Sequence, residues 1–185
     1  MRIEIGDIVL RDIVASDIED DIRWNTVDME WHDWDAPWEK DEPFDADEYR
    51  RNALEKLAKV KDDSQMRLEF EIDYMGRHIG SVNCYRIDDN YEWTPDKEGH
   101  LALGIDINEP EFWNRGIGGT AFAAWMDYLF SQGFNELYTQ TWSGNVRMLR
   151  MAERLGFTLC HRKIGNFTVR GQVYDGVTLR ITAVS

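Results

Sequence analysis

The sequence contains few cysteines, few prolines and no long hydrophobic run. Its two cysteines, Cys84 and Cys160, lie far apart and form no C-x-x-C pair, which argues against a disulfide framework and a zinc site. Residues 1–7 include no continuous apolar segment of the kind found in signal peptides or membrane spans. No linker rich in proline, glycine or serine divides the chain. We therefore expect a cytoplasmic protein without a metal site, folded as one domain over residues 1–185.

Positive charge is also scarce. The 21 lysines and arginines face 35 aspartates and glutamates, so the net charge is −14. Such a surplus of negative charge repels nucleic acids and anionic membranes, and neither is expected as a partner. It favours a cationic partner, such as a polyamine, an aminoglycoside or a basic peptide terminus. Alternatively, it only keeps the protein in solution, and the net charge does not separate these two interpretations.

The segment 111–121 is the most informative part of what the chain does contain. Gly116, Gly118 and Gly119 follow Arg115 at the start of a helix with apolar periodicity. The first N–H groups of a helix are unpaired and carry the positive end of its dipole, so glycines there favour anion binding. A P-loop is excluded because no Lys-Ser or Lys-Thr pair follows the last glycine. A dinucleotide fingerprint fits the glycine spacing, but the next expected strand, residues 136–141, ends without the acidic residue that this motif needs.

The order of the flanking segments is more specific than the glycines alone. An apolar strand at residues 101–107 precedes the loop, and a helix ending at Gly133 and a strand at residues 136–141 follow it. A second helix then opens at Asn145 and closes at residues 155–157. This order resembles the GNAT superfamily of acetyl-CoA-dependent N-acetyltransferases over nearly the whole chain. The Pro-Glu-Phe-Trp-Asn-Arg-Gly run that begins at Pro110 is similar to the branch of ribosomal-protein acetyltransferases of the Rim type.

This resemblance implies a fold and a cosubstrate. The expected fold is an α/β (α+β) domain with a mixed, mostly antiparallel sheet of about seven strands flanked by helices. Its fourth and fifth strands would splay into a wedge for acetyl-CoA. Backbone amides near Ile105 and Ile107 would pair with the pantetheine arm. The residues implied at the pyrophosphate are Arg115, Gly116, Ile117, Gly118, Gly119 and Thr120. Asn145 matches a position that contacts coenzyme A, and it can equally be the N-cap of the second helix.

The catalytic positions depart from the family pattern. Many members carry a tyrosine four residues before the closing Gly-Phe pair to protonate the leaving sulfur, and Ala152 stands there. The usual position of a general base on the fourth strand holds Ala102. The same strand face holds Asp106, our candidate base, and His100, a candidate proton relay. Alternatively, His100 lies at an exposed strand entry and Asp106 pairs with an arginine.

The acceptor side is expected in segment 24–39, which is rich in tryptophan and acidic residues. Trp31 and Trp34, with Asp33 and Asp35, would bind a cationic amine through cation–π contacts and ion pairs. The alternative is a hydrophobic cover over the sheet, because tryptophans 31, 34 and 38 have helical spacing.

The sequence thus predicts acetyl transfer from acetyl-CoA to a primary amine, by direct attack in a ternary complex. The acceptor would be a small cationic amine or a peptide N-terminus. The alternative is a catalytically weak sensor or scaffold that binds acetyl-CoA, which the missing tyrosine permits. The resemblance also makes a homodimer possible, because superfamily members often pair through their terminal strands.

Overall fold

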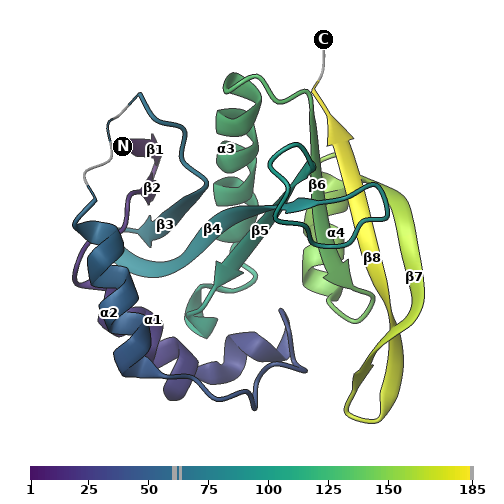
Figure 1. Ribbon diagram of the computed structural model, residues 1–185, viewed down its shortest axis with the longest axis horizontal. Helices are drawn as coiled ribbons and strands as arrows, with labels where there is room; N and C mark the ends of the chain where they lie inside the picture. The colour runs from purple at the N-terminus through teal and green to yellow at the C-terminus, as the bar shows by residue number, and fades with distance from the viewer. Residues whose placement is uncertain (60–61, 63, 184–185) are drawn as a thin grey trace.

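The computed structural model describes residues 1–59, 62 and 64–183. Eight strands form one sheet in the order β1-β2-β3-β4-β5-β6-β8-β7 (Figure 1). The strands are β1 Arg2–Ile5, β2 Ile8–Arg11, β3 Glu69–Tyr74, β4 Arg77–Ile87, β5 His100–Ile107, β6 Glu136–Trp142, β7 Thr158–Val169 and β8 Gln172–Thr182. The helices are α1 Asp17–Thr26, α2 Ala46–Leu57, α3 Ile117–Ser131 and α4 Val146–Arg154, with short 3₁₀ helices η1 Met29–Asp33 and η2 Pro110–Phe112.

All neighbouring strands are antiparallel except β5 and β6, which α3 connects as a parallel pair. The expected α/β domain with a mostly antiparallel sheet is therefore confirmed. The sheet has eight strands rather than about seven because β1 pairs with β2 through a tight turn at Gly6, whose φ is +59°. The alternation of Ile3 and Ile5 with polar neighbours is typical of such a half-buried strand.

The helices lie on two sides of the sheet (Figure 1). Phe122, Trp125 and Leu129 of α3 are completely buried against the sheet, where they form the main core together with residues of β2 to β5 and α4. Ile18 and Ile22 of α1 pack instead on α2, in a smaller separate cluster. Within the part of the chain that the structure describes, no helix is long and apolar enough to span a membrane.

The parallel pair separates after a short contact. β5 is registered with β4 along its whole length, whereas β6 meets β5 only at the pairs Ala102–Tyr138 and Leu103–Thr139. The hydroxyl of Thr139 donates a hydrogen bond to the carbonyl of Leu103 at 2.9 Å. Beyond this point β6 remains paired with β8 only. The predicted splay therefore exists, and it leaves one edge of β5 without a strand partner.

Candidate active site

A cavity of about 300 Å³ opens where β5 and β6 separate. Its walls come from β5, the middle of β6, the start of α3, one face of α4 and the segment after α1. Many of the predicted site residues line it, namely Trp31, Trp34, Asp35, Ile105, Asp106, Ile107, Gly116, Ile117, Gly118, Gly119 and Asn145. The structure thus brings candidate phosphate, pantetheine and acceptor positions to one place.

The backbone of β5 offers polar groups to this cavity. The N–H of Asn108 donates to the carbonyl of Ile79 across the β4 ladder. Because an antiparallel ladder alternates in direction, the backbone groups of Ile105 and Ile107 face away from β4, toward the gap. The indole of Trp113 already donates to the carbonyl of Ile107 at 2.6 Å. The amides of Ile105 and Ile107 therefore face the gap, on the side where the resemblance to the GNAT superfamily predicts the pantetheine arm.

The start of α3 supplies the anion-binding end of the cavity. Gly116 has φ +79°, a left-handed conformation that glycine adopts without strain. The first backbone bond of the helix runs from the N–H of Thr120 to the carbonyl of Gly116. The N–H groups of Ile117, Gly118 and Gly119 precede that bond and have no helical partner. Three donors and the helix dipole therefore converge on one spot, as a phosphate requires.

Two predicted phosphate residues do not line the cavity. Arg115 lies over the ring of Phe112, with 5.8 Å between the guanidinium carbon and the ring centroid. The hydroxyl of Thr120 bonds back to the carbonyl of Gly116 at 3.2 Å. Asn145 does line the cavity, and its side chain accepts a hydrogen bond from the N–H of Met148 at 3.1 Å. Its N-cap role is therefore established, whereas its contact with coenzyme A stays a prediction.

Three arginines of α4 line the same cavity and were not predicted. Arg147, Arg150 and Arg154 form no ion pair with any residue that the structure describes. The Arg147 guanidinium lies between the rings of Trp34 and Trp113, at 3.8 and 4.6 Å. In so acidic a chain, cations without an ion-pair partner that gather along one face of a helix indicate an anionic ligand. Their spacing along one face of the helix was visible in the sequence and could have revealed them.

The acceptor side of the cavity holds two carboxylates, Asp35 and Asp106. Neither has a cationic or hydrogen-bonding partner among the described residues. Burial raises the pKa of Asp106 well above its ordinary value, and the charge of Asp35 raises it further. Asp35 is open to the cavity but enclosed by protein, and this burial, with the charge of Glu39, raises its pKa to about 6. A carboxylate with a raised pKa is a better proton acceptor near neutral pH.

Two other predicted residues lie elsewhere. His100 begins β5, about 20 Å along the strand from Asp106, and its Nε2 lies 3.0 Å from the exposed carboxylate of Asp89. Asp33 pairs with Arg170 at 2.6 Å and with Lys40 at 3.0 Å. The structure therefore does not bring His100 or Asp33 to the cavity, since alternation along a strand gives its face but not its distance from the site.

Hydrogen bonds from tryptophans hold the acceptor segment in place. The indole of Trp24, which is buried in α1, donates to Glu109 just after β5 at 3.0 Å. The indole of Trp31 donates to the carbonyl of Trp24, and that of Trp142 in β6 donates to the carbonyl of Trp34, each at 2.8 Å. Segment 29–35 is thus tied to both separated strands. The expected helical spacing of its tryptophans produces only the short helix η1.

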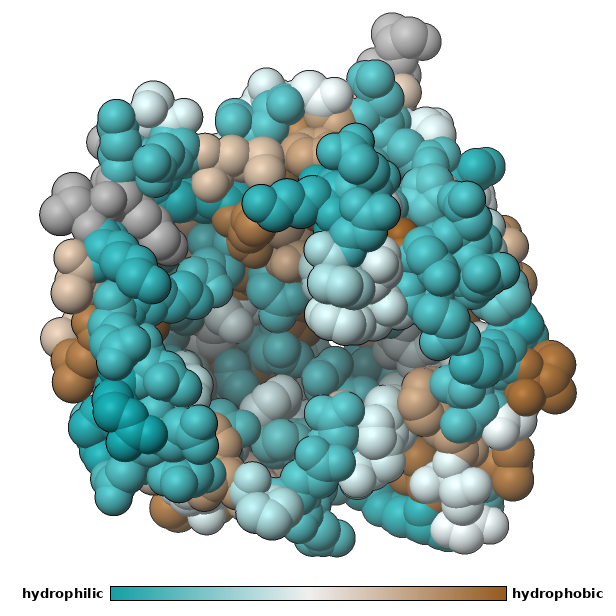
Figure 2. Space-filling view, viewed as in Figure 1, coloured by the Kyte–Doolittle hydropathy of each residue, from teal (hydrophilic) through white to brown (hydrophobic). Residues whose placement is uncertain are grey.

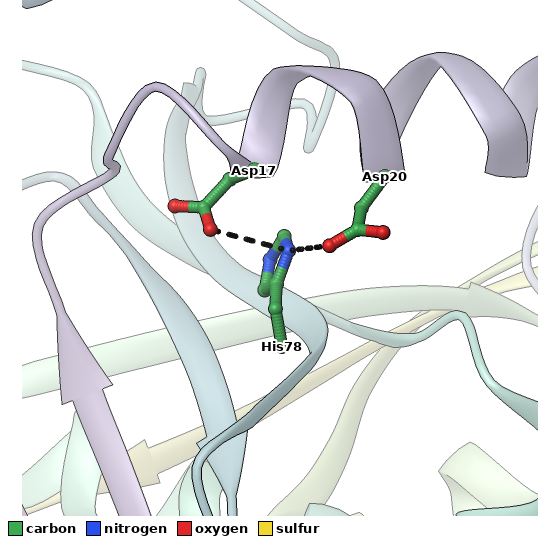
Figure 3. Close-up of side chains that lie close together, drawn as sticks. All are labelled: Asp17, Asp20 and His78. Atoms are coloured by element: carbon green, nitrogen blue, oxygen red, sulfur yellow. Dashed lines mark hydrogen bonds and ion pairs between the residues drawn. The ribbon is translucent and has the colours of Figure 1, made fainter.

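A different set of acidic residues lies between α1 and strands β3 and β4. Figure 3 shows His78 of β4 pointing toward Asp17 and Asp20 of α1, with its Nδ1 at 3.6 and 3.2 Å from their carboxylates. The opposite nitrogen, Nε2, lies 3.1 Å from Glu71. Asp17 also binds Arg11 through two hydrogen bonds of 2.6 and 2.9 Å. These groups have the proximity of a cation site, but they satisfy one another, and we interpret them as a network that fixes α1 to the sheet.

A second cavity of about 610 Å³ adjoins the first. The two share Asp35, Gln140 and Thr141 as common walls. This second cavity extends from the strand gap toward β7, β8 and the segment between β4 and β5. Figure 2 shows this face of the molecule hollowed near its centre, with hydrophilic residues along much of the rim.

Comparison with known proteins agrees with this geometry. The family described as "Acetyltransferase (GNAT) domain" matches residues 7–158. The chain belongs to the GNAT acetyltransferase family. At the level of sequence, no curated protein matches it.

Several solved GNAT structures share the fold. A GNAT-family acetyltransferase from Bacillus anthracis superposes with a TM-score of 0.72 and 14% identity, over 98% of each chain. RimL, a ribosomal L7/L12 α-N-protein acetyltransferase in complex with coenzyme A, gives 0.73 and 14%, again over 98% of each chain. Spermidine N-acetyltransferase from Vibrio cholerae, in complex with coenzyme A and spermine, gives 0.71 and 18%, over 96% of each chain. GNAT membership and these neighbours support acetyl-CoA as the cosubstrate, as the sequence predicts.

Proposed function

We propose that the protein transfers the acetyl group of acetyl-CoA to a primary amine, by direct attack in a ternary complex. The observation that carries this proposal is the position of Asp35 and Asp106. These unpaired carboxylates lie in the cavity that also contains the free edge of β5 and the anion-binding start of α3. The names of two structural neighbours, RimL and spermidine N-acetyltransferase, are consistent with amine acceptors.

The donor would occupy the side of the cavity rich in backbone donors and arginines. Its pyrophosphate would accept from the N–H groups of Ile117, Gly118 and Gly119. The guanidinium groups of Arg150 and Arg154 at the same cavity would add charge for further phosphate oxygens. The pantetheine arm would follow the amides of Ile105 and Ile107, and one of these amides would stabilise the oxyanion that forms during attack.

The acceptor amine would enter as an ammonium ion and pair with Asp35. An ammonium ion has no lone pair, so Asp106 would take one proton before the nitrogen attacks the thioester carbonyl. The attack forms the C–N bond and a tetrahedral oxyanion, and the collapse of this oxyanion breaks the C–S bond. The sulfur leaves as a thiolate, and the nitrogen releases its second excess proton to solvent to give the neutral amide. Ala152 is buried and offers no proton to that thiolate. We therefore propose that solvent protonates the leaving group.

Ala152 also supports the alternative proposal, a protein that binds acetyl-CoA with little turnover. A thiol-release assay over a panel of amines and basic peptides, beside calorimetric binding of acetyl-CoA, separates the two. Turnover on any amine supports the enzyme, and tight binding without turnover supports the sensor. Absence of acetyl-CoA binding would contradict both.

A glycine substitution tests the donor site directly. A Cβ at position 118 would lie 3.5 Å from Ile107, an ordinary contact, so Gly118→Ala should fold and bind acetyl-CoA within a few-fold of the parent. Gly118→Glu places a carboxylate at the phosphate position, and we expect a loss of affinity of about 100-fold or more. Calorimetry measures both affinities, and thermal unfolding verifies the fold of each variant. Unchanged affinity in Gly118→Glu would refute the assignment of this loop.

The same proposal covers the domain organisation, the location and the oligomeric state of the protein. We propose that residues 1–185 act as one acetyl-CoA-binding domain in the cytoplasm. A homodimer through the terminal strands stays a prediction, which the mass of the protein in solution checks. Strand β7 is available for it, because it is an edge of the sheet and its Ile164 is exposed.

A further inference from the structure

The second cavity has walls unlike those of the donor cavity. Four separate segments line it: the chain after η1, the segment between β4 and β5, the middle of β6, and the paired strands β7 and β8. The residues used below are Asp35, Trp38, Glu39, Glu92, Trp93 and Phe167. Since Asp35 belongs to both cavities, a molecule whose amine reaches Asp35 can extend its remaining atoms into the second cavity.

Hydrogen bonds from one side chain keep this cavity open and shaped. The amide nitrogen of Gln140 donates to the carbonyl of Tyr91 at 2.8 Å and to the hydroxyl of Thr178 at 3.1 Å. Its amide oxygen accepts from the hydroxyl of Tyr85 at 3.2 Å. Gln140 thereby fixes the segment between β4 and β5 against β6 and β8. These bonds fix the relative positions of segments that line the cavity.

Aromatic faces make up part of the wall. Trp38 stacks on Phe167, with their ring centroids 3.8 Å apart. Trp93 is 68% exposed, although it is a large aromatic side chain at a cavity. A ligand that covered this ring would remove apolar surface from water and, if cationic, would gain a cation–π contact.

The charge of the cavity is mainly negative. Asp35, Glu39 and Glu92 line it, against one lysine, Lys163, which pairs with Glu92 at 2.6 Å between two exposed side chains. Glu39 has no cationic partner among the residues that the structure describes. Its charge raises the pKa of Asp35. Asp35 and Glu39 therefore form an acidic wall that begins at the reaction centre and continues outward.

We propose that the second cavity selects linear amines that carry a second positive charge, such as diamines and polyamines. The reacting amine lies at Asp35 and Asp106, and the second cation pairs with Glu39 beside the faces of Trp38 and Trp93. This inference rests on the proposed acetyltransferase function and adds the chemical class of the acceptor. Glu39 accepts a hydrogen bond from the indole of Trp38 at 3.2 Å, but a monoamine leaves its charge without a cation. An amino acid brings a carboxylate into an acidic cavity.

The test compares two acceptors of equal alkyl length. The value of kcat/KM for 1,4-diaminobutane should exceed that for butylamine by about tenfold or more at pH 8. Glu39→Gln should reduce that preference about fivefold or more, because kcat/KM should fall further for the diamine than for butylamine. Glu55→Gln, which neutralises an exposed acid on α2 outside both cavities, should leave both values unchanged. Thermal unfolding of each variant verifies that the fold is retained.

Each outcome has one meaning. Equal kcat/KM for the two amines would overturn the inference and leave the proposed acetyltransferase intact. A preference for the diamine that persists in Glu39→Gln, at parental strength, would overturn the assignment of the second cation to this cavity. Turnover on neither amine, with acetyl-CoA still bound, would also overturn the inference, and the panel of amines and basic peptides would then decide the proposed function.

Discussion

Two groups of clustered carboxylates in this protein differ in their surroundings. Beneath α1, Asp17 and Glu71 are neutralised by Arg11 and His78 at distances of 2.6 to 3.1 Å. In the cavity between β5 and β6, Asp35 and Asp106 form no ion pair with any residue that the structure describes. Arg11 and backbone bonds hold the pKa of Asp17 below its ordinary value despite burial, whereas burial raises that of Asp106.

This difference separates structural from functional acids. A paired buried carboxylate stabilises the fold, and removal of its partner leaves an uncompensated charge. An unpaired carboxylate in a cavity destabilises the empty protein and persists where a ligand supplies the missing charge. The protein should therefore lose stability when the first group is altered and lose activity when the second is altered.

The largest expected effect is at Asp17. Asp17→Asn weakens the bidentate pair with Arg11 and the hydrogen bond from the N–H of Val14. We expect the free energy of unfolding to fall by about 3 kcal/mol, while kcat of the folded variant stays within about twofold. Urea unfolding measures the first quantity, with Asp127→Asn on the exposed side of α3 as the control. If the stability of Asp17→Asn equals that of the control, the network is not structural.

Asp106→Asn should have the opposite pattern. The amide cannot accept a proton, so kcat at neutral pH should fall by about 10²-fold. The melting temperature should stay constant or rise, because a buried and unpaired charge is removed. Steady-state kinetics and thermal unfolding of the same preparation test both halves. A loss of only a few-fold in kcat would remove Asp106 from the catalytic role.

The pH dependence of activity sharpens the contrast. The pKa of Asp35 is raised to about 6, so its carboxylate is charged above that pH and becomes protonated as the pH falls through it. The value of kcat/KM for the amine should therefore decline below pH 6, with an apparent pKa that belongs to the coupled pair of Asp35 and Asp106. In Asp35→Asn this acidic decline should move to lower pH, because the charge of Asp35 no longer raises the pKa of Asp106, although burial keeps that pKa above its ordinary value. A profile identical to that of the parent would contradict a role for Asp35.

The smallest effect concerns His78. Burial lowers its pKa, but the hydrogen bond to Glu71 and the charges of Glu71 and Asp17 outweigh burial and raise it. The resulting stabilisation is complete below pH 6.5 and is lost as the pH rises through the folded-state pKa. His78→Gln should therefore lower stability more at pH 6 than at pH 9, by about 1 kcal/mol. Equal destabilisation at the two pH values would show that the imidazolium charge contributes nothing.

Much of the fold could be predicted from the sequence because its signals are local. The wedge was implied by the resemblance to the GNAT superfamily, which rests on the order of strand, glycine loop, helix and strand around Gly116. Strand β1 was not predicted, although Ile3 and Ile5 alternate with polar residues and Gly6 provides the turn that pairs β1 with β2. The separation of β5 from β6 after Leu103 was an expectation from family resemblance, and the register of the strands confirms it.

The site could be predicted only in part. The glycines at the start of α3 were identified from the sequence. The positive φ of a glycine and the unpaired N–H groups of a helix start both depend on residues that are adjacent in the chain. Arg150 and Arg154 were missed, although their spacing on α4 was available. His100 was placed in the site because it shares a strand face with Asp106. Asp33 was placed there because it belongs to the segment rich in tryptophan and acidic residues. The structure puts His100 at the far end of β5 and pairs Asp33 with Arg170 and Lys40.

The sequence by itself determined the anion-binding start of α3, because glycine conformation and helix geometry depend on neighbouring residues. It also determined the strong excess of acid over base. Only the tertiary structure decided which acids meet. Asp35 reaches Asp106 because tryptophan hydrogen bonds anchor the segment after α1 to β6 and to the chain beyond β5. Such contacts join residues far apart in the chain, and no local pattern specifies them.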